Sequence, residues 1–161
     1  MGGCIERFGE EEFGLVTLTN EIHGHLGIYS TLGAKMGLRA KEEFDARGCG
    51  GHISVRSYAG LEPPVSCFND GLQVSTGASL GHGLISVAGE GDVRPEADFR
   101  CSSEAFRMRL LPGFESRIRE DIKKGVALYG HSEKYWLYVR SLALGYWSGW
   151  DRREIFEMIP L

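Results

Sequence analysis

Residues 67–83 read CFNDGLQVSTGASLGHG, and within this stretch a helical pattern gives way to a glycine-rich turn. A helix can begin near Ser66 or Asn69 and carry Leu72 and Val74. Three glycines then end it: Gly77, Gly81 and Gly83. Their spacing matches neither the P-loop nor the dinucleotide-binding fingerprint, and no lysine follows. We therefore interpret them as turn glycines and not as a phosphate cradle.

The chain before this stretch predicts one long helix and one strand. A helix is expected from Thr19 to about Arg47, because apolar residues recur there at helical spacing: Leu26, Leu32, Met36, Leu38 and Phe44. The glycine-rich run 48–51 ends it. His52 to Tyr58 alternates with a period of two, as a strand does, and Pro63-Pro64 then forces a loop.

The chain after residue 83 predicts two strands and then helices. The strands are Leu84 to Val87 and Ala105 to Leu111, separated by a polar loop that holds Gly89, Gly91 and Pro95. A helix follows Pro112-Gly113 and is capped by Gly130, a second runs from Ser132 to Leu144, and a short last one begins at Asp151 and includes Met158. The order predicts an α+β fold, with a mixed or antiparallel sheet packed against helices, and helices at the C-terminus.

The composition predicts one compact domain over residues 1–161 and excludes several classes of partner. The chain is 42% hydrophobic, which is enough for a real core. A net charge of −4 gives no basic stripe for nucleic acid. No apolar run approaches the roughly 18 residues of a membrane span, and the start does not resemble a secretory signal. We therefore expect a cytoplasmic protein that binds neither nucleic acid nor membrane.

Two histidines form the sharpest local feature, His23-Gly24-His25. Two imidazoles separated by one residue can converge on an ion if the backbone between them is not helical, and Gly24 permits that bend. Because the pair lies in the first turns of the expected helix, convergence requires that the helix begin after His25 or that only one imidazole bind. The alternative is a solvated surface pair.

Cys67 is the cysteine whose sequence position suggests a reactive or metal-binding thiol. It precedes a predicted helix start, where backbone N–H groups and the helix dipole lower a thiol pKa, so a thiolate is expected near neutral pH. A thiolate with imidazoles suits zinc, or else nickel or iron. The alternative is a small buried hydrophobe. The other cysteines, Cys4, Cys49 and Cys101, form no Cys-x-x-Cys pair.

The two motifs together resemble the core domain of the FmdE-like family, which takes its name from formylmethanofuran dehydrogenase, over residues 16–111. One family motif, Cys-x-x-Asp-Ala-Ile-Gln-x-x-Thr-Gly-Cys-Thr-x-Gly-Lys-Gly, is matched in register by Cys67, Asp70, Gln73, Thr76, Gly77, Gly81 and Gly83. The other, His-Gly-His-x-Cys-Pro-Gly with a glycine four residues on, is matched by His23, Gly24, His25 and Gly33. The C-terminal zinc finger of some members is not expected, because no cysteine follows Cys101.

Several motif residues differ from the family pattern. Gly27 and Ala78 stand where the family has cysteines, and His82 replaces the usual lysine. We therefore expect no redox pair at Cys67. What remains is a three-ligand metal set, His23, His25 and Cys67, with an open coordination position. His82 is a fourth ligand, a proton carrier or an exposed loop residue.

The other polar residues of the Cys67 motif suggest supporting roles. Asp70 and Gln73 either orient the histidines through hydrogen bonds or are a helix N-terminal charge and a surface amide. Thr76 belongs to the same motif. A dense aromatic cluster in residues 135–150 is either core or a dimer surface. Because the cluster crowds more than one face of a helix, and because relatives intertwine their helices in dimers, we expect a homodimer that buries much of it. A cofactor stack is a third alternative.

Two functional hypotheses follow. The first is a metal-dependent enzyme whose ion polarises a carbonyl or activates water for a small-molecule ligand. The second is a non-catalytic metal sensor, carrier or assembly partner. The resemblance implies a link to the molybdenum or tungsten enzyme of one-carbon metabolism, but this chain contains nothing like a pterin site or an iron–sulfur ligand run, so that activity is not carried over.

Overall fold

Helices and a five-stranded sheet form the fold in the computed structural model, which describes residues 2–89, 91 and 93–161, with side chains from Glu12 onwards. The helices are α1 (Gly2–His23), α2 (Ile28–Ala46), α3 (Phe68–Thr76), α4 (Pro112–Tyr129) and α5 (Glu133–Gly149), and the 3-10 turn η1 (Val65–Cys67) leads into α3. The strands are β1 (Ser54–Ser57), β2 (Ile85–Val87), β3 (Glu96–Cys101), β4 (Glu104–Leu110) and β5 (Phe156–Pro160). The predicted α+β class is confirmed.

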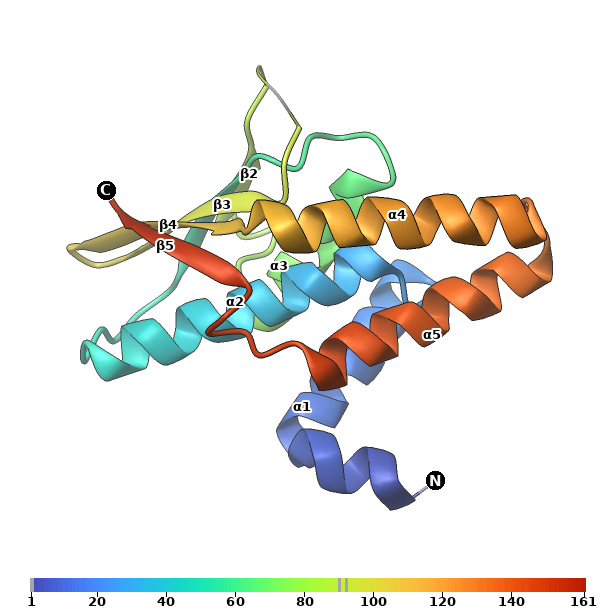
Figure 1. Cartoon of the computed structure of the whole chain (residues 1–161). Coiled ribbons are helices and arrows are strands. Elements are labelled where there is room, and N and C mark those ends of the chain that lie inside the picture. Colours follow the sequence, from blue (N-terminus) through green and yellow to red (C-terminus); the bar gives the residue numbers. More distant parts are fainter. Residues whose placement is uncertain (1, 90, 92) are drawn as a thin grey trace.

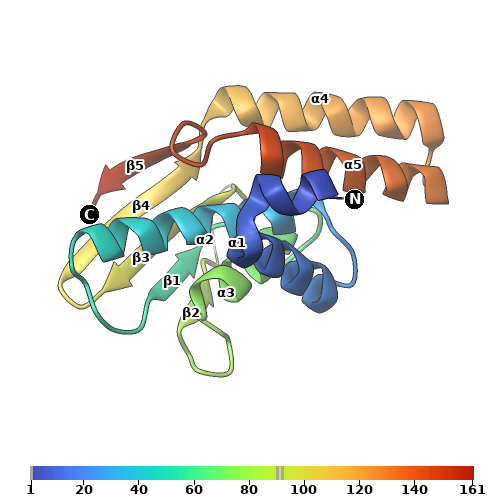
Figure 2. The same cartoon turned by 90° about the horizontal axis from the view of Figure 1, so that it is seen from below.

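The sheet has the order β2-β1-β3-β4-β5 and is mixed, because β1 and β2 are parallel and the other neighbours are antiparallel. Helix α2 lies along one face of this sheet (Figures 1 and 2). Phe99 and Phe106 are cross-strand partners on that face, and Phe44 of α2 packs on Phe106 with ring centroids 4.7 Å apart. These buried rings form the centre of the core.

The opposite face of the sheet carries a partly buried polar network. Arg107 of β4 pairs with its cross-strand neighbour Asp98 at 2.5 Å and contacts Glu96 at 3.3 Å. The Tyr58 hydroxyl donates to Asp98 at 2.9 Å, and its ring lies under the Arg107 guanidinium. These bonds from Arg107 and Tyr58 hold the pKa of Asp98 below its usual range although burial opposes them.

Helices α2 and α3 cross with their backbones in contact. A Cβ added at Gly33 would overlap the carbonyl group of Phe68, and one added at Gly71 would overlap the carbonyl oxygen of Ser30. Both positions therefore require glycine for a steric reason. The crossing places the first turn of α3 beside the start of α2.

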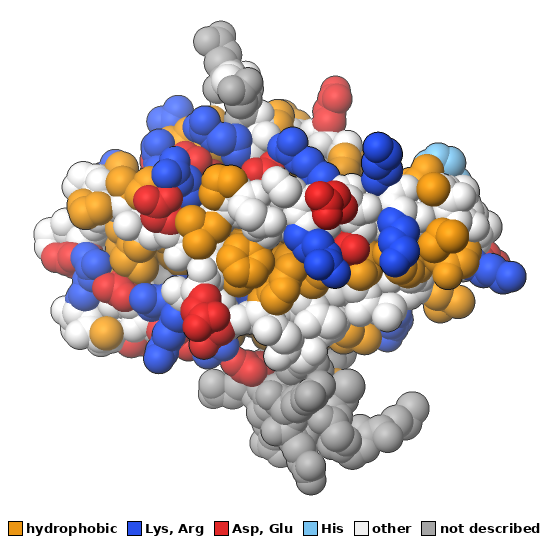
Figure 3. All heavy atoms as spheres, in the orientation of Figure 1, with side chains coloured by type: hydrophobic (Ala, Val, Ile, Leu, Met, Phe, Trp, Pro, Cys, Tyr) orange, Lys and Arg blue, Asp and Glu red, His pale blue; other side chains and the backbone are white. Residues whose placement is uncertain are grey.

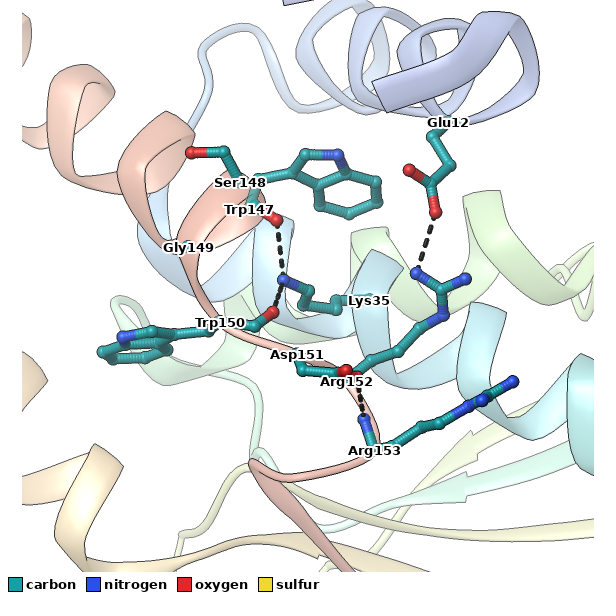
Figure 4. A pocket seen from close by; sticks show the side chains of 9 residues that line it. All are labelled: Glu12, Lys35, Trp147, Ser148, Gly149, Trp150, Asp151, Arg152 and Arg153. Carbon is teal, nitrogen blue, oxygen red and sulfur yellow. Dashed lines mark hydrogen bonds and ion pairs between the residues drawn. The ribbon is translucent and has the colours of Figure 1, made fainter. Parts of the chain in front are cut away.

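Helices α4 and α5 form an antiparallel pair that extends beyond the sheet (Figure 1). Lys35 of α2 joins the end of α5 to the core, because its buried ammonium donates to the carbonyls of Tyr146, Trp147 and Trp150. Figure 4 shows the contacts with Trp147 and Trp150. The three carbonyls lie at the C-terminal end of α5, where intrahelical N–H donors become scarce, and that of Tyr146 also accepts from the backbone N–H of Trp150. Nearby, Arg152 pairs with Glu12 and Glu42.

The surface over the α4–α5 pair carries hydrophobic side chains among basic ones (Figure 3). Several large apolar residues on these two helices are exposed: Val126, Leu128, Tyr129, Trp136 and Leu137. Others on α5, among them Tyr146 and Trp147, are buried within the chain. The aromatic cluster is thus divided between core and surface. No helix among the described residues is long and apolar enough to cross a membrane.

Most predicted elements are confirmed, with shifts of one to a few residues. The strand at 52–58 is β1, the helix before Gly77 is α3, and the strands at 84–87 and 105–111 are β2 and β4. Gly77 ends α3 in the left-handed conformation with φ 73°. The helices expected after Pro112-Gly113 and at Ser132 are α4 and α5.

Three predictions about elements were wrong. The single helix from Thr19 to Arg47 is two helices, because α1 ends at His23 and α2 begins at Ile28. The loop expected to reach Pro95 is followed at once by a strand that was not predicted, β3. The short helix expected from Asp151 is a turn and then β5, because residues 156–160 pair with β4 at the sheet edge.

Candidate functional site

The His23-Gly24-His25 segment lies in the break between α1 and α2. Gly24 has φ 81°, the left-handed conformation that glycine adopts without strain, and it turns the chain sharply after His23. The backbone between the two histidines is therefore not helical. The imidazole rings lie together, with centroids 4.6 Å apart, as the predicted convergence on an ion requires.

His23 is oriented by the first turn of α3. Its Nδ1 lies 2.6 Å from Oδ2 of Asp70. A carboxylate accepts a proton and cannot donate one, so Nδ1–H donates and the lone pair of the ring stays on Nε2. That Nε2 atom is buried and has no hydrogen-bond partner among the described residues. Asp70 thus holds His23 in the tautomer that leaves Nε2 as a free acceptor.

Both imidazoles present Nε2 to one small space beside Gly27. A Cβ built at Gly27 would lie 3.3 Å from Nε2 of His25 and 3.5 Å from Nε2 of His23. The same point is 3.3 Å from the hydroxyl oxygen of Ser30. Because Gly27 has no side chain, this space is left to two ring nitrogens and one hydroxyl.

The surroundings of His25 favour its neutral imidazole. Burial lowers the pKa of His25, and the neighbouring His23 lowers it further. A neutral ring is the form that can accept a proton or bind a metal ion. On its outer side His25 contacts the edge of Trp136, with ring centroids 5.0 Å apart.

Cys67 lies at the N-cap position of α3, one helical turn before Asp70. Its thiol is half-buried and free. Burial raises the pKa of this thiol, and the charge of Asp70 raises it further. The predicted lowering of the pKa by the helix start is wrong for the metal-free chain, because burial and a nearby carboxylate outweigh the dipole of a nine-residue helix.

The predicted ligands are brought together only in part. Within the described residues, no three His, Cys, Asp or Glu side chains are placed so that they could hold one metal ion. The rings of His23 and His25 form a pair, and Asp70 contacts Nδ1 of His23. Cys67 precedes Asp70 at the start of the same helix.

The three auxiliary residues have separate contacts. The Gln73 amide oxygen accepts from the backbone N–H of Leu80 at 3.0 Å and so fixes the turn after α3. The Thr76 hydroxyl donates to the carbonyl of Leu72 at 2.6 Å. His82 is exposed and contacts Ser79, with Nδ1 and Oγ 3.0 Å apart. Of the polar motif residues expected to orient a histidine, Asp70 does so through its carboxylate.

A hollow of about 320 Å³ opens next to His25. Its walls are mostly apolar, and it lies between the start of α2 and the first turns of α5. The lining residues are His25, Leu26, Glu133, Trp136, Leu137 and Arg140. Neither Glu133 nor Arg140 takes part in an ion pair within the described part of the chain. A small molecule in this hollow would touch the His25 ring.

Three residues of the site were not predicted as functional from the sequence. Gly27 was noted only as a missing cysteine, although a glycine in that place leaves space beside both rings. Ser30 carries no signal, because a buried serine looks like any other small residue of a helix. Trp136 belonged to an aromatic cluster whose contact with His25 spans 111 residues of chain and follows from tertiary packing alone.

Comparison with known proteins supports the resemblance. Residues 22–136 match the protein family described as "FmdE, Molybdenum formylmethanofuran dehydrogenase operon". The match includes both histidines, Cys67, Asp70 and the start of α5, and so extends beyond the two motifs. A search of curated proteins gave no match. Since the match covers most of the chain, this protein belongs to the FmdE family.

Proposed function

We propose that this protein binds one metal ion through Nε2 of His23 and Nε2 of His25, with zinc as the preferred ion. The observation that carries the proposal is the space beside Gly27, which both nitrogens face within 3.5 Å of one point. A buried ring nitrogen without a partner is costly unless something occupies its lone pair. An ion between the two nitrogens satisfies both at once.

Asp70 supports this role from behind His23. A histidine that binds a metal usually donates its other ring N–H to a carboxylate or carbonyl, which fixes the tautomer and the ring orientation. The 2.6 Å contact from Nδ1 of His23 to Asp70 has this arrangement. A histidine with a purely structural role would need no bare nitrogen on its far side.

The remaining coordination positions are open to other donors. We propose Cys67 as the third protein ligand, because it lies one turn before Asp70 at the helix start that already contacts His23. No three such side chains surround one point among the described residues, so the Cys67 thiol would have to move to join an ion held by the two nitrogens. A thiolate and two imidazoles suit zinc, and nickel or iron would also fit. The last position is left for water or for a small molecule.

The hollow beside His25 supports an enzyme in preference to a closed structural site. A bound ion of this kind polarises a carbonyl or generates hydroxide from water. Trp136 and Leu137 offer apolar walls, while Arg140 carries a positive charge without an ion-pair partner among the described residues. We propose that a small molecule with an apolar body and an anionic group enters here and faces the His25 side of the ion.

The test is zinc titration followed by calorimetry on the wild type, Gly27→Ala and Gly113→Ala. Gly27 has φ −90°, so alanine suits its backbone, and the added methyl group would occupy the space between the nitrogens. We expect one ion per chain in the wild type and an affinity lower by about tenfold or more in Gly27→Ala. Gly113→Ala is the matched control, because nothing lies within 4 Å of its added Cβ.

Gly27→Cys places the same Cβ into the space but adds a donor sulfur beyond it, as in the family motif. Its zinc affinity should therefore lie above that of Gly27→Ala. Equal affinity in the wild type, Gly27→Ala and Gly27→Cys would refute the site. If the wild type binds zinc but the bound ion carries no exchangeable water, the alternative of a metal carrier or sensor would be favoured.

We also propose that the protein is a homodimer in which the exposed apolar side chains of α4 and α5 meet a second copy. Leu137 is 67% exposed and Leu128 59% exposed, which is unusual for two leucines on one helical pair.

A further inference from the structure

We propose that Cys49 and Cys101 are a redox-sensitive pair that a low-molecular-weight disulfide converts to an intramolecular disulfide. The two cysteines lie outside both sequence motifs and away from the histidine pair in the chain. The pair is independent of the proposed metal site. It is carried by a direct contact between two segments that are far apart in sequence.

The contact joins the loop after α2 to the last residue of β3. The Cys49 thiol donates to the carbonyl oxygen of Cys101, with Sγ and O 2.8 Å apart, and the two thiols also hydrogen-bond each other. Both cysteines are free thiols in this structure. Thiols in contact are the starting point for a disulfide, whose Cα atoms lie about 4.4–6.8 Å apart.

The two thiols differ in accessibility, which assigns their roles. Cys101 is buried, with 2% of its surface exposed. Cys49 is half-buried and lines a cavity of about 210 Å³ together with Lys41 and His52, both of which are exposed. A small oxidant can therefore reach Cys49 from this cavity. The buried Cys101 is the resolving cysteine, which attacks Cys49 in the second step.

The exchange proceeds in two balanced steps. The Cys49 thiolate attacks one sulfur of the small disulfide, a mixed disulfide forms, and one small thiolate leaves. The Cys101 thiolate then attacks the Cys49 sulfur and expels the second small thiolate. The protein loses two electrons and two protons, and the small disulfide is reduced to two small thiols that take up those protons.

Oxidation has a structural consequence in the walls of the cavity. The disulfide would tie together residues 52 positions apart and restrain the loop that separates α2 from β1. The same cavity is lined by Thr76 and Gly77, the end of the motif helix α3. The redox state of the pair would thus set how freely this end of α3 and the neighbouring loop move.

The experiment equilibrates the full chain in buffers of varied ratio of reduced to oxidised glutathione, followed by alkylation and tryptic mass spectrometry. We expect a product lighter by two hydrogens, with peptide 48–56 linked to peptide 101–107, and a thermal midpoint raised by roughly 5–15 °C. Cys49→Ala should lose both changes, whereas Cys67→Ala should keep them.

Two results would overturn the pairing. One is a wild-type chain in which Cys49 and Cys101 are both alkylated at every glutathione ratio. The other is a disulfide that joins different cysteines or two chains. The wild-type peptide map decides between these outcomes even if Cys49→Ala fails to fold. Cys101→Ala provides a second check. Without Cys101 the exchange cannot go beyond its first step, so the mixed disulfide of Cys49 with glutathione should accumulate.

Discussion

The α2–α3 crossing and the α4–α5 pair are both helix–helix contacts, and they are built on opposite principles. At the crossing, Gly33 and Gly71 let two backbones touch, so no larger residue fits. In the α4–α5 pair, the Tyr138 ring packs on Gly125, and several large side chains stay exposed. The first contact fixes the position of Asp70 beside His23, whereas the second leaves a surface on which another molecule can pack.

The largest effect on the free energy of unfolding is expected at the α2–α3 crossing. Gly71→Ala would place a methyl group into the Ser30 carbonyl and the Ala34 nitrogen, both of which are backbone atoms that cannot move aside. We expect the free energy of unfolding to fall by about 4 kcal/mol or more. Urea unfolding measures this loss, with Gly145→Ala near the end of α5 as the control, because nothing lies within 4 Å of the Cβ added there. A loss below about 1 kcal/mol would show that the helices separate easily.

A smaller effect is expected where the two regions meet, at Lys35. Burial lowers the pKa of Lys35 to about 8, so the ammonium is still the main form at pH 7 and has three donors for three carbonyls. Lys35→Met leaves the C-terminal carbonyls of α5 without that donor. We expect a loss of about 2–3 kcal/mol in the free energy of unfolding.

Lys41→Met is the matched control for this change, because Lys41 lies on the same helix and is exposed. Its effect should stay within about 0.5 kcal/mol. If both lysine variants unfold at the same urea concentration, Lys35 does not hold the end of α5 to the core.

The smallest effect on the monomer is expected on the exposed surface of α5. Leu137→Glu should change the free energy of unfolding of a single chain by no more than about 0.5 kcal/mol, because Leu137 is largely exposed. In a homodimer the same charge would be buried, so the dimer of the variant should dissociate at a much higher protein concentration than the wild-type dimer. Analytical ultracentrifugation checks this, with Leu61→Glu as the control at another exposed leucine. A monomeric wild type at micromolar concentration would disprove the dimer.

The sequence predicts the elements whose pattern is local and misses those that depend on pairing. Gly77 and the alternation at 52–58 specify α3 and β1 from neighbouring residues. Strand β3 was missed because its charged residues, among them Asp98, are buried through pairing with Arg107 on β4, which sequence alone does not reveal. The segment 156–160 is a strand because its backbone pairs with β4, which a local sequence pattern does not predict.

The candidate site shows the same division. The two histidines and the bend at Gly24 follow from three consecutive residues, and the space beside Gly27 could be inferred from the missing motif cysteine. The partner of His23 lies 47 residues away, and its position depends on the glycines that bring α2 and α3 together. The pKa of Cys67 was predicted in the wrong direction because burial cannot be derived from a helix start alone.

The most direct test of the metal site is the X-ray absorption spectrum of the protein loaded with one equivalent of zinc. The account predicts two imidazole nitrogens at about 2.0–2.1 Å, and one sulfur at about 2.3 Å if Cys67 is the third ligand. The imidazole signal should fall when His23 or His25 is replaced by alanine. A wild-type spectrum without imidazole scattering, or one unchanged in both variants, would contradict the claim that the two nitrogens beside Gly27 hold the ion.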